Sequence, residues 1–178
     1  MKWKPHMEFG KISDWCQADN RSLIAADETN HRVIVQNPDG TTRYYGRKGS
    51  KPGEFHFPRS CIALGSSVYI VDSWNHRVQV FEFPSWKFQF EFGGFGTGPG
   101  KFFCPCSITF KDPWLIVADS NNARLSFHMA DGKYLFSSTV GGDRFPRKVR
   151  GANGPIEVQY ENGEWSRLEH VWTESGRP

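Results

Sequence analysis

The chain has 178 residues, which is enough for one domain with a hydrophobic core. Its net charge of +3 permits nucleic-acid binding but does not require it. No apolar run approaches the roughly 20 residues of a membrane span, and the N-terminal residues lack the apolar segment of a secretory signal. Four cysteines are too few for a dense disulfide framework. We therefore expect a reduced, cytoplasmic protein that does not contact membranes.

One pattern occurs three times along the chain. A short apolar run ends in an aspartate, a polar turn follows, and an arginine five residues after the aspartate opens a second run rich in β-branched and aromatic residues. The aspartates are Asp27, Asp72 and Asp119, at spacings of 45 and 47 residues. A period of this length indicates a repeat array, and a unit of four short strands is typical of a propeller blade.

In chain order, the first predicted element is a strand over residues 3–9. Residues 3–10 align with residues 86–93, which read as the last strand of the second repeat. The first blade is predicted over about 13–45, with a strong turn at Asn37-Pro-Asp-Gly40 between its last two strands. A glycine-rich linker over 45–58 then leads to the second blade.

The second blade is predicted over about 58–92 and the third over about 105–139. The linker between them, 92–105, aligns without gaps to 45–58, and its glycines supply positive φ angles. A fourth, degenerate blade is expected over about 146–171, where Asn162-Gly163 predicts a hairpin. We expect strand 3–9 to complete this blade and to cover exposed strand edges.

These elements predict an all-β fold, a β-propeller of four-stranded antiparallel blades in one domain that covers residues 1–178. Few stretches have a helical period, while Gly and Pro separate short apolar runs. Blade faces need neighbours to bury them. Three arrangements are open: a closed ring of about four blades, a partial ring that a homodimer completes, and a truncated domain. An open arc would leave two apolar blade faces bare.

The repeated turns resemble the NHL repeat, which is named for its Asn-His-Leu residues. Here the corresponding residues are Asn30-His-Arg32, Asn75-His-Arg77 and Asn122-Ala-Arg124, and the Gly-rich linkers add to the likeness. The resemblance covers about residues 22–140. It implies a β-propeller, often of six blades. Some relatives bind RNA, and some NHL-like propellers are lyases with a metal in the central channel.

The three aspartate–arginine pairs are predicted to be structural. Each carboxylate can accept N–H groups of its turn, and each guanidinium can reach back across the strand pair. Presence in every blade suits a scaffold better than a single site. The pairs are Asp27 with Arg32, Asp72 with Arg77, and Asp119 with Arg124.

The sequence favours a non-enzymatic protein with no cofactor and no metal. A channel metal would need several inward ligands, and no histidine lies in a predicted innermost strand. The six histidines are His6, His31, His56, His76, His128 and His170. Cys104-Pro-Cys106, Cys16 and Cys61 lack a second pair at zinc spacing, so we interpret them as small buried apolar residues.

Binding is expected on the face that gathers the second-to-third turns and the blade linkers. Such a basic, amide- and aromatic-bearing face suits a protein partner, which is our first hypothesis. Single-stranded RNA is the alternative, because loops of this kind hold phosphates and stack bases. A channel-metal lyase or hydrolase is the second alternative. The predicted binding residues are Arg47, Lys48, Lys51, Trp74, Asn75, His76, Lys101, Asn121, Asn122, Arg144 and Arg147.

Overall fold

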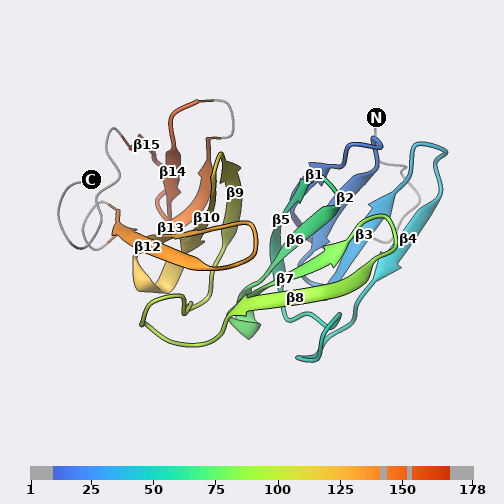
Figure 1. Cartoon of the computed structure of the whole chain (residues 1–178), viewed down its shortest axis with the longest axis horizontal. Helices are drawn as coiled ribbons and strands as arrows, with labels where there is room; N and C mark the ends of the chain where they lie inside the picture. Colours follow the sequence, from blue (N-terminus) through green and yellow to red (C-terminus); the bar gives the residue numbers. More distant parts are fainter. Residues whose placement is uncertain (1–9, 141–143, 152–153, 169–178) are drawn as a thin grey trace.

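The computed structural model describes residues 10–140, 144–151 and 154–168. These residues form four antiparallel sheets, each built from consecutive strands (Figure 1). The first two sheets contain four strands each, in chain order from the inside outward. Their strands are β1 (Ile12–Gln17), β2 (Leu23–Asp27), β3 (Arg32–Gln36) and β4 (Thr42–Tyr45), then β5 (Pro58–Leu64), β6 (Ser67–Asp72), β7 (Arg77–Glu82) and β8 (Lys87–Gly93).

The third sheet repeats this order, and the fourth has three described strands. Single-turn helices η1 (Ser73–Asn75) and η2 (Ser120–Asn122) follow the second strands of sheets two and three. The remaining strands are β9 (Ser107–Lys111), β10 (Trp114–Asp119), β11 (Arg124–His128) and β12 (Tyr134–Thr139), then β13 (Pro146–Arg150), β14 (Glu157–Tyr160) and β15 (Trp165–Arg167). The predicted all-β propeller is confirmed, and it has four blades.

Burial along each strand follows from its place in the blade. The middle strands β2, β6 and β10 are buried at nearly every residue, and β6 and β10 have neighbouring sheets on both faces. The outer strand β8 instead alternates between exposed and half-buried residues, since one of its faces meets water. The uninterrupted apolar runs of the sequence therefore mark the middle of each blade.

Three hydrophobic cores join consecutive blades. Val68 and Ile70 on β6 pack toward blade one, while their neighbours Tyr69 and Val71 pack toward blade three. The side chains of β10 alternate in the same way, and Ile116 belongs to the core between blades three and four. Side chains alternate across a strand, so β6 and β10 each contribute to two cores. The described residues thus form one continuous stack of sheets.

The glycine-rich linkers dock on this stack through buried aromatic rings. Phe55 and Phe102 are fully buried, and each linker also closes on itself through a parallel bridge. Gly93 has a φ of +110°, and a Cβ there would lie 2.4 Å from the Phe102 ring. Only glycine permits both this backbone and this close approach. The two linkers lie along the lower side of the view in Figure 1.

The predicted strand over residues 3–9 lies outside the described residues. Gly10 is described, and its N–H donates to Asp27 Oδ1 at 3.0 Å. The N–H of His56 makes the same contact with Asp72 at 2.7 Å. Gly10 therefore occupies the place of the end of a linker, and not the place of Gly93 at the end of an outer strand, as the sequence alignment of 3–10 with 86–93 implied.

Candidate functional site

A buried aspartate organises the linker side of blade two. Asp72 is fully buried, and its carboxylate accepts hydrogen bonds from the His56 N–H at 2.7 Å, Asn75 Nδ2 at 2.8 Å and Arg77 Nε at 2.9 Å. Burial raises the pKa of Asp72, and these hydrogen bonds oppose that effect. The carboxylate ties together the end of β6, the following turn and the linker from blade one.

Arg77 extends this network to the linker backbone. Its Nη2 donates to the carbonyl oxygens of Lys51 and Glu54, both at 3.1 Å, and its Nη1 bonds Glu91 at 2.8 Å. The Asn75 amide donates to the carbonyl of Gly49 at 2.8 Å. We call this set the linker clamp: the aspartate, asparagine and arginine of one repeat and the linker groups that they bind.

The same clamp occurs in blade three. Asp119 accepts from the Phe103 N–H at 2.7 Å and from Asn122 and Arg124, each at 2.8 Å. Arg124 in turn donates to the carbonyl oxygens of Thr97, Gly98 and Lys101. Blade one has the same triad, in which Asn30 and Arg32 both donate to Asp27 at 2.9 Å. The aspartate–arginine pairs thus contact the scaffold in each repeat.

The histidines of the repeated turns also hold the linkers. His31 Nδ1 accepts from the Phe57 N–H at 3.0 Å, and His76 Nδ1 accepts from the Cys104 N–H at 3.0 Å. Desolvation lowers the pKa of both imidazoles, with the charges of His56 and Lys48 also acting on His31. A neutral ring is required for each acceptor role. Sequence analysis did not foresee this contact, because it joins residues 26 and 28 positions apart.

Two aromatic clusters are exposed on the linker side. Trp74 is 52% exposed, and its ring lies 5.0 Å from that of Phe57 and 5.3 Å from that of His56. Phe95 is 68% exposed and contacts the rings of His76 and Phe103. We call these the Trp74 cluster and the Phe95 cluster. Each one lies where a linker meets a repeated turn.

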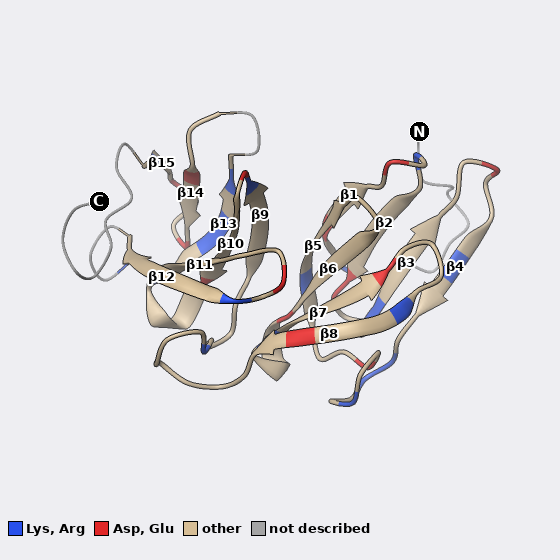
Figure 2. Ribbon diagram, viewed as in Figure 1, with Lys and Arg blue, Asp and Glu red and all other residues tan. Residues whose placement is uncertain are grey.

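The predicted cations on this side are exposed, but they are not all unpaired. Arg47 forms an ion pair with Glu54 at 2.9 Å, and Lys101 Nζ donates to the Gly93 carbonyl at 3.2 Å. Arg144 lies over the Tyr160 ring, with its guanidinium carbon 4.5 Å from the ring centroid. Lys48, Lys51 and Asn121 are exposed on the linkers and turns. Figure 2 shows cationic residues on the linker after β4 and on β13.

Three predicted binding residues have other roles in the structure. The Asn75 and Asn122 amides donate within their own clamps. Arg147 lies at the central cavity, where its Nη1 is 3.7 Å from Cys106 Sγ. The structure therefore places Trp74 and His76 among the aromatic rings of the linkers, and Arg147 at the central cavity.

The innermost strands surround a cavity of about 680 Å³. Blade one and blade four both contribute to its wall, the former through Asp14 and Trp15 and the latter through Arg147 and Lys148. Burial raises the pKa of Asp14, against hydrogen bonds from Ser60 and from backbone N–H groups. Sequence analysis did not identify this cavity, because its lining comes from four innermost strands whose residue types differ from blade to blade.

The described residues contain no group of three His, Cys, Asp or Glu side chains placed to hold a metal ion. None of the described helices is long and apolar enough to cross a membrane. The repeat pattern of the sequence aligns Cys16 with Cys61, but by strand register Cys61 corresponds to Trp15, so that alignment is wrong by one residue. That offset points Cys16 and Cys61 into the same core between blades one and two.

Known proteins share parts of this sequence and this fold. No protein-family model matches the chain. RING finger protein nhl-1 of Caenorhabditis elegans is 42% identical over 76 residues, which are 42% of this chain and 8% of that protein. The repeats are NHL repeats. The chain spans a small part of this relative, whose RING-type activity therefore does not transfer with the likeness.

Solved structures share the fold at low sequence identity. A streptogramin B lyase superposes with a TM-score of 0.65 at 15% identity, over 94% of this chain and 59% of the lyase. The computationally designed Ika4 protein superposes with a TM-score of 0.68 at 10% identity, over 97% of this chain and 99% of Ika4. The RRP9 WD40 repeats superpose with a TM-score of 0.67 at 11% identity, over 91% of this chain and 52% of that chain. These likenesses concern the propeller architecture alone.

Proposed function

We propose that this NHL propeller is a non-enzymatic scaffold that binds a protein partner through its linker side. The observation that carries the proposal is the pair of exposed aromatic clusters around Trp74 and Phe95. Aromatic side chains at the centre of an interface supply much of its binding energy. Exposed cations around them, such as Lys48 and Lys51, suit a partner that presents acidic side chains at the rim.

The linker clamp supports this proposal. Its hydrogen bonds fix the backbone of both linkers, so the Trp74 cluster and the Phe95 cluster stand on ordered loops. A preorganised surface loses less conformational entropy when it binds. The repeated polar residues are engaged within the clamp, which leaves the exposed rings as the groups that a partner contacts.

Single-stranded RNA is the second candidate for the same side. Trp74 could stack on a base, and Lys48, Lys51 and Lys101 could contact phosphates. The ion pair of Arg47 with Glu54 reduces the positive charge of the first linker, which favours protein over RNA. The lyases among the structural neighbours are at most 15% identical, and the described residues offer no metal-ligand group, so we propose no lyase activity.

The test is site-specific photo-crosslinking in cells that express the protein. A photoreactive amino acid replaces Trp74 or Phe95, and a matched probe replaces Leu135 on outer strand β12, which is also partly exposed. We expect discrete protein adducts from positions 74 and 95 and none from position 135. Equal adducts at all three positions would overturn the proposal, and adducts to RNA would favour the alternative.

A variant supplied by the chain itself then measures the contribution of the ring. Asn121 occupies in blade three the place of Trp74 in blade two, on the same kind of turn. Trp74→Asn should therefore fold normally and weaken binding of the identified partner by about 2 kcal/mol or more. If RNA binds instead, affinity should fall with salt by a slope of about 0.7 per phosphate contact.

A further inference from the structure

Four side chains at one structural position meet at the central cavity. Ser13, Arg59 and Arg147 each lie at the register shift near the start of an innermost strand, one residue after Ile12, Pro58 and Pro146. Cys106 has the same place just before β9. All four line the cavity. At this position, blade one has a hydroxyl, blade two a guanidinium, blade three a thiol and blade four a second guanidinium.

The guanidinium of Arg59 has a carboxylate partner. Its Nε lies 3.1 Å from Glu28 Oε1, and its Nη1 lies 3.2 Å from Cys106 Sγ. Glu28 is the residue after the clamp aspartate of blade one, and it serves the arginine at the start of the next blade. Glu28 also pairs with Lys11 at 2.8 Å, so this one carboxylate serves both cations.

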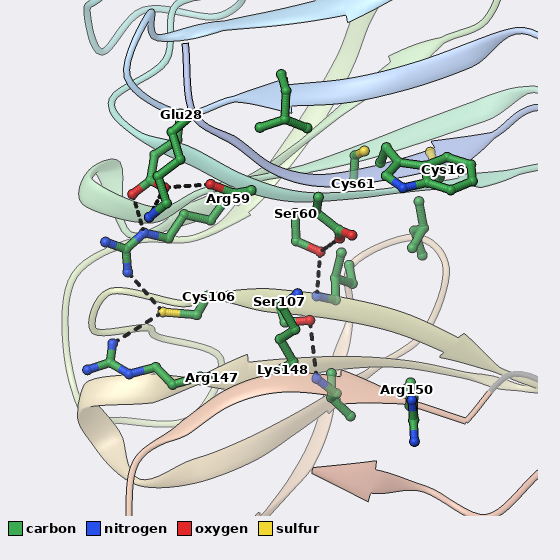
Figure 3. A pocket seen from close by; sticks show the side chains of 18 of the residues that line it. Cys16, Glu28, Arg59, Ser60, Cys61, Cys106, Ser107, Arg147, Lys148 and Arg150 are labelled. Atoms are coloured by element: carbon green, nitrogen blue, oxygen red, sulfur yellow. Dashed lines mark hydrogen bonds and ion pairs between the residues drawn. The ribbon is translucent and has the colours of Figure 1, made fainter. Parts of the chain in front are cut away.

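Arg147 has no such carboxylate among the described residues. The residue that corresponds to Glu28 one blade before Arg147 is Ser120, whose hydroxyl donates to the Pro146 carbonyl at 2.6 Å. The polar contact of Arg147 within the described part of the chain is the 3.7 Å approach to Cys106 Sγ, a weak acceptor. Figure 3 shows Arg59 and Arg147 reaching toward Cys106 from opposite sides.

The neighbouring charges leave an excess of cations around Arg147. Lys148 is exposed and forms no ion pair within the described residues, although it acts on Asp14 electrostatically. Asp14 already accepts a hydrogen bond from Ser60. Arg150 pairs with Glu157 at 2.7 Å. A guanidinium presents five N–H donors in a planar fork that suits an oxyanion. Arg147 and Lys148 therefore have N–H donors available to bind an oxyanion.

We propose that the cavity is a second binding site, for a small molecule that carries a phosphate or carboxylate group. Its oxyanion would bind Arg147 and Lys148, in the place that Glu28 takes beside Arg59. The volume of about 680 Å³ is in the range of small-molecule sites. Trp15 and Trp165 also line the cavity and are exposed, so they can contact an apolar or aromatic part of the ligand.

The test uses phenyl phosphate, benzoate and inorganic phosphate as probes, with benzyl alcohol as the uncharged control. Binding is followed by nuclear magnetic resonance of backbone amides and arginine Nε–H groups. We expect phenyl phosphate or benzoate to shift the signals of Arg147 and Val149, and benzyl alcohol to leave them unchanged. Comparing the two anions distinguishes a phosphate ligand from a carboxylate ligand, and inorganic phosphate shows whether the ring contributes.

Two variants test the origin of the affinity. Arg147→Gln should weaken binding by about tenfold or more, because a charge-assisted contact is lost. Ser120→Glu should supply the missing carboxylate and abolish binding while Arg147 remains. Lys133→Gln, on the exposed turn before β12, is the control with the same charge change as Arg147→Gln and should bind like wild type.

Several results would overturn the proposal. These are the absence of shifts with every anion up to its solubility, shifts that Arg147→Gln does not reduce, and equal losses in Arg147→Gln and Lys133→Gln. Ser120 is buried, so Ser120→Glu could fail to fold. In that case the binding measured with Arg147→Gln alone decides whether the proposal holds. The outcome is independent of the linker side, since Trp74→Asn should leave phenyl phosphate binding unchanged.

Discussion

Replacement of Arg77 by Met tests whether the linker clamp stabilises the fold. Met keeps the apolar stem of the side chain and removes the guanidinium. The substitution breaks the ion pair with Asp72 and frees the carbonyl oxygens of Lys51 and Glu54. The Arg77 side chain is 8% exposed, so solvent cannot replace these contacts without opening the linker.

The expected cost follows from what remains around Asp72. Breaking a buried ion pair by removing one partner costs about 3–5 kcal/mol, because the other charge stays buried. Asp72 keeps hydrogen bonds from the His56 N–H, Asn75 and Gln79. These donors compensate in part, so we expect Arg77→Met to lower the free energy of unfolding by about 3 kcal/mol, the lower end of that range.

Urea unfolding followed by tryptophan fluorescence measures this change. Arg47→Met is the control, because Arg47 pairs with Glu54 in the same linker but its side chain is 80% exposed. An exposed ion pair contributes about 0–1 kcal/mol, so this variant should unfold nearly as wild type does. Asp72→Asn and the double variant complete a cycle in which we expect a coupling energy of about 1–3 kcal/mol.

Two results would refute this reasoning. Arg77→Met could unfold within about 0.5 kcal/mol of wild type, the range of an ordinary surface substitution. Alternatively, the costs of Asp72→Asn and Arg77→Met could simply add, which would show that the two side chains do not stabilise each other. A variant of Arg77 that is stable but no longer binds the partner would assign this residue to the interface.

Two further predictions concern stability. Desolvation lowers the pKa of His128 to about 4, so this histidine is neutral in the folded state at neutral pH. The stability that it contributes is present above the unfolded pKa of 6.5 and is lost as the pH falls toward 4. Between pH 7.5 and pH 5 this loss of stability is about 2 kcal/mol. Urea titrations should show a smaller loss in His128→Gln than in wild type. An equal loss in both proteins would contradict the assignment. Gly93→Ala should cost about 3 kcal/mol or more in the same assay, because its Cβ would lie 2.4 Å from the Phe102 ring and 2.9 Å from the His76 carbonyl oxygen. Gly65→Ala, whose φ is +55° but whose Cβ meets open space, should cost only about 1 kcal/mol, and similar costs at the two glycines would argue against the close docking of the linker.

Much of the fold can be predicted because its signals are local. An apolar run, an aspartate and an arginine five residues later belong to one hairpin, so a single stretch of sequence defines the middle of a blade. The buried phenylalanines Phe55 and Phe102 follow glycines at fixed positions in the linkers. Threefold repetition of such local signals predicts the architecture, since each blade needs a neighbour to bury its faces.

The central cavity could not be predicted, because it depends on register between distant strands. Cys106 meets Arg59 and Arg147 across 47 and 41 residues of sequence. Arg59 and Arg147 each lie at a shift in strand pairing, and a shift of one residue reverses which face a side chain occupies. The charge of the linker was also overestimated from sequence, since Glu54 pairs with Arg47 only after the linker folds back on itself.

The structure separates two kinds of residue in each repeated turn. The aspartate, asparagine and arginine are engaged in the linker clamp, so their side chains have little capacity left for a partner. The residue two positions after the aspartate is exposed in all three turns, and it is Thr29, Trp74 or Asn121. Because the clamp fixes the turn without this side chain, its identity can change from blade to blade at little cost to folding. If the linker side binds a partner as proposed, its selectivity should depend on the residues in which the repeats differ, and among these three Trp74 presents a large apolar ring.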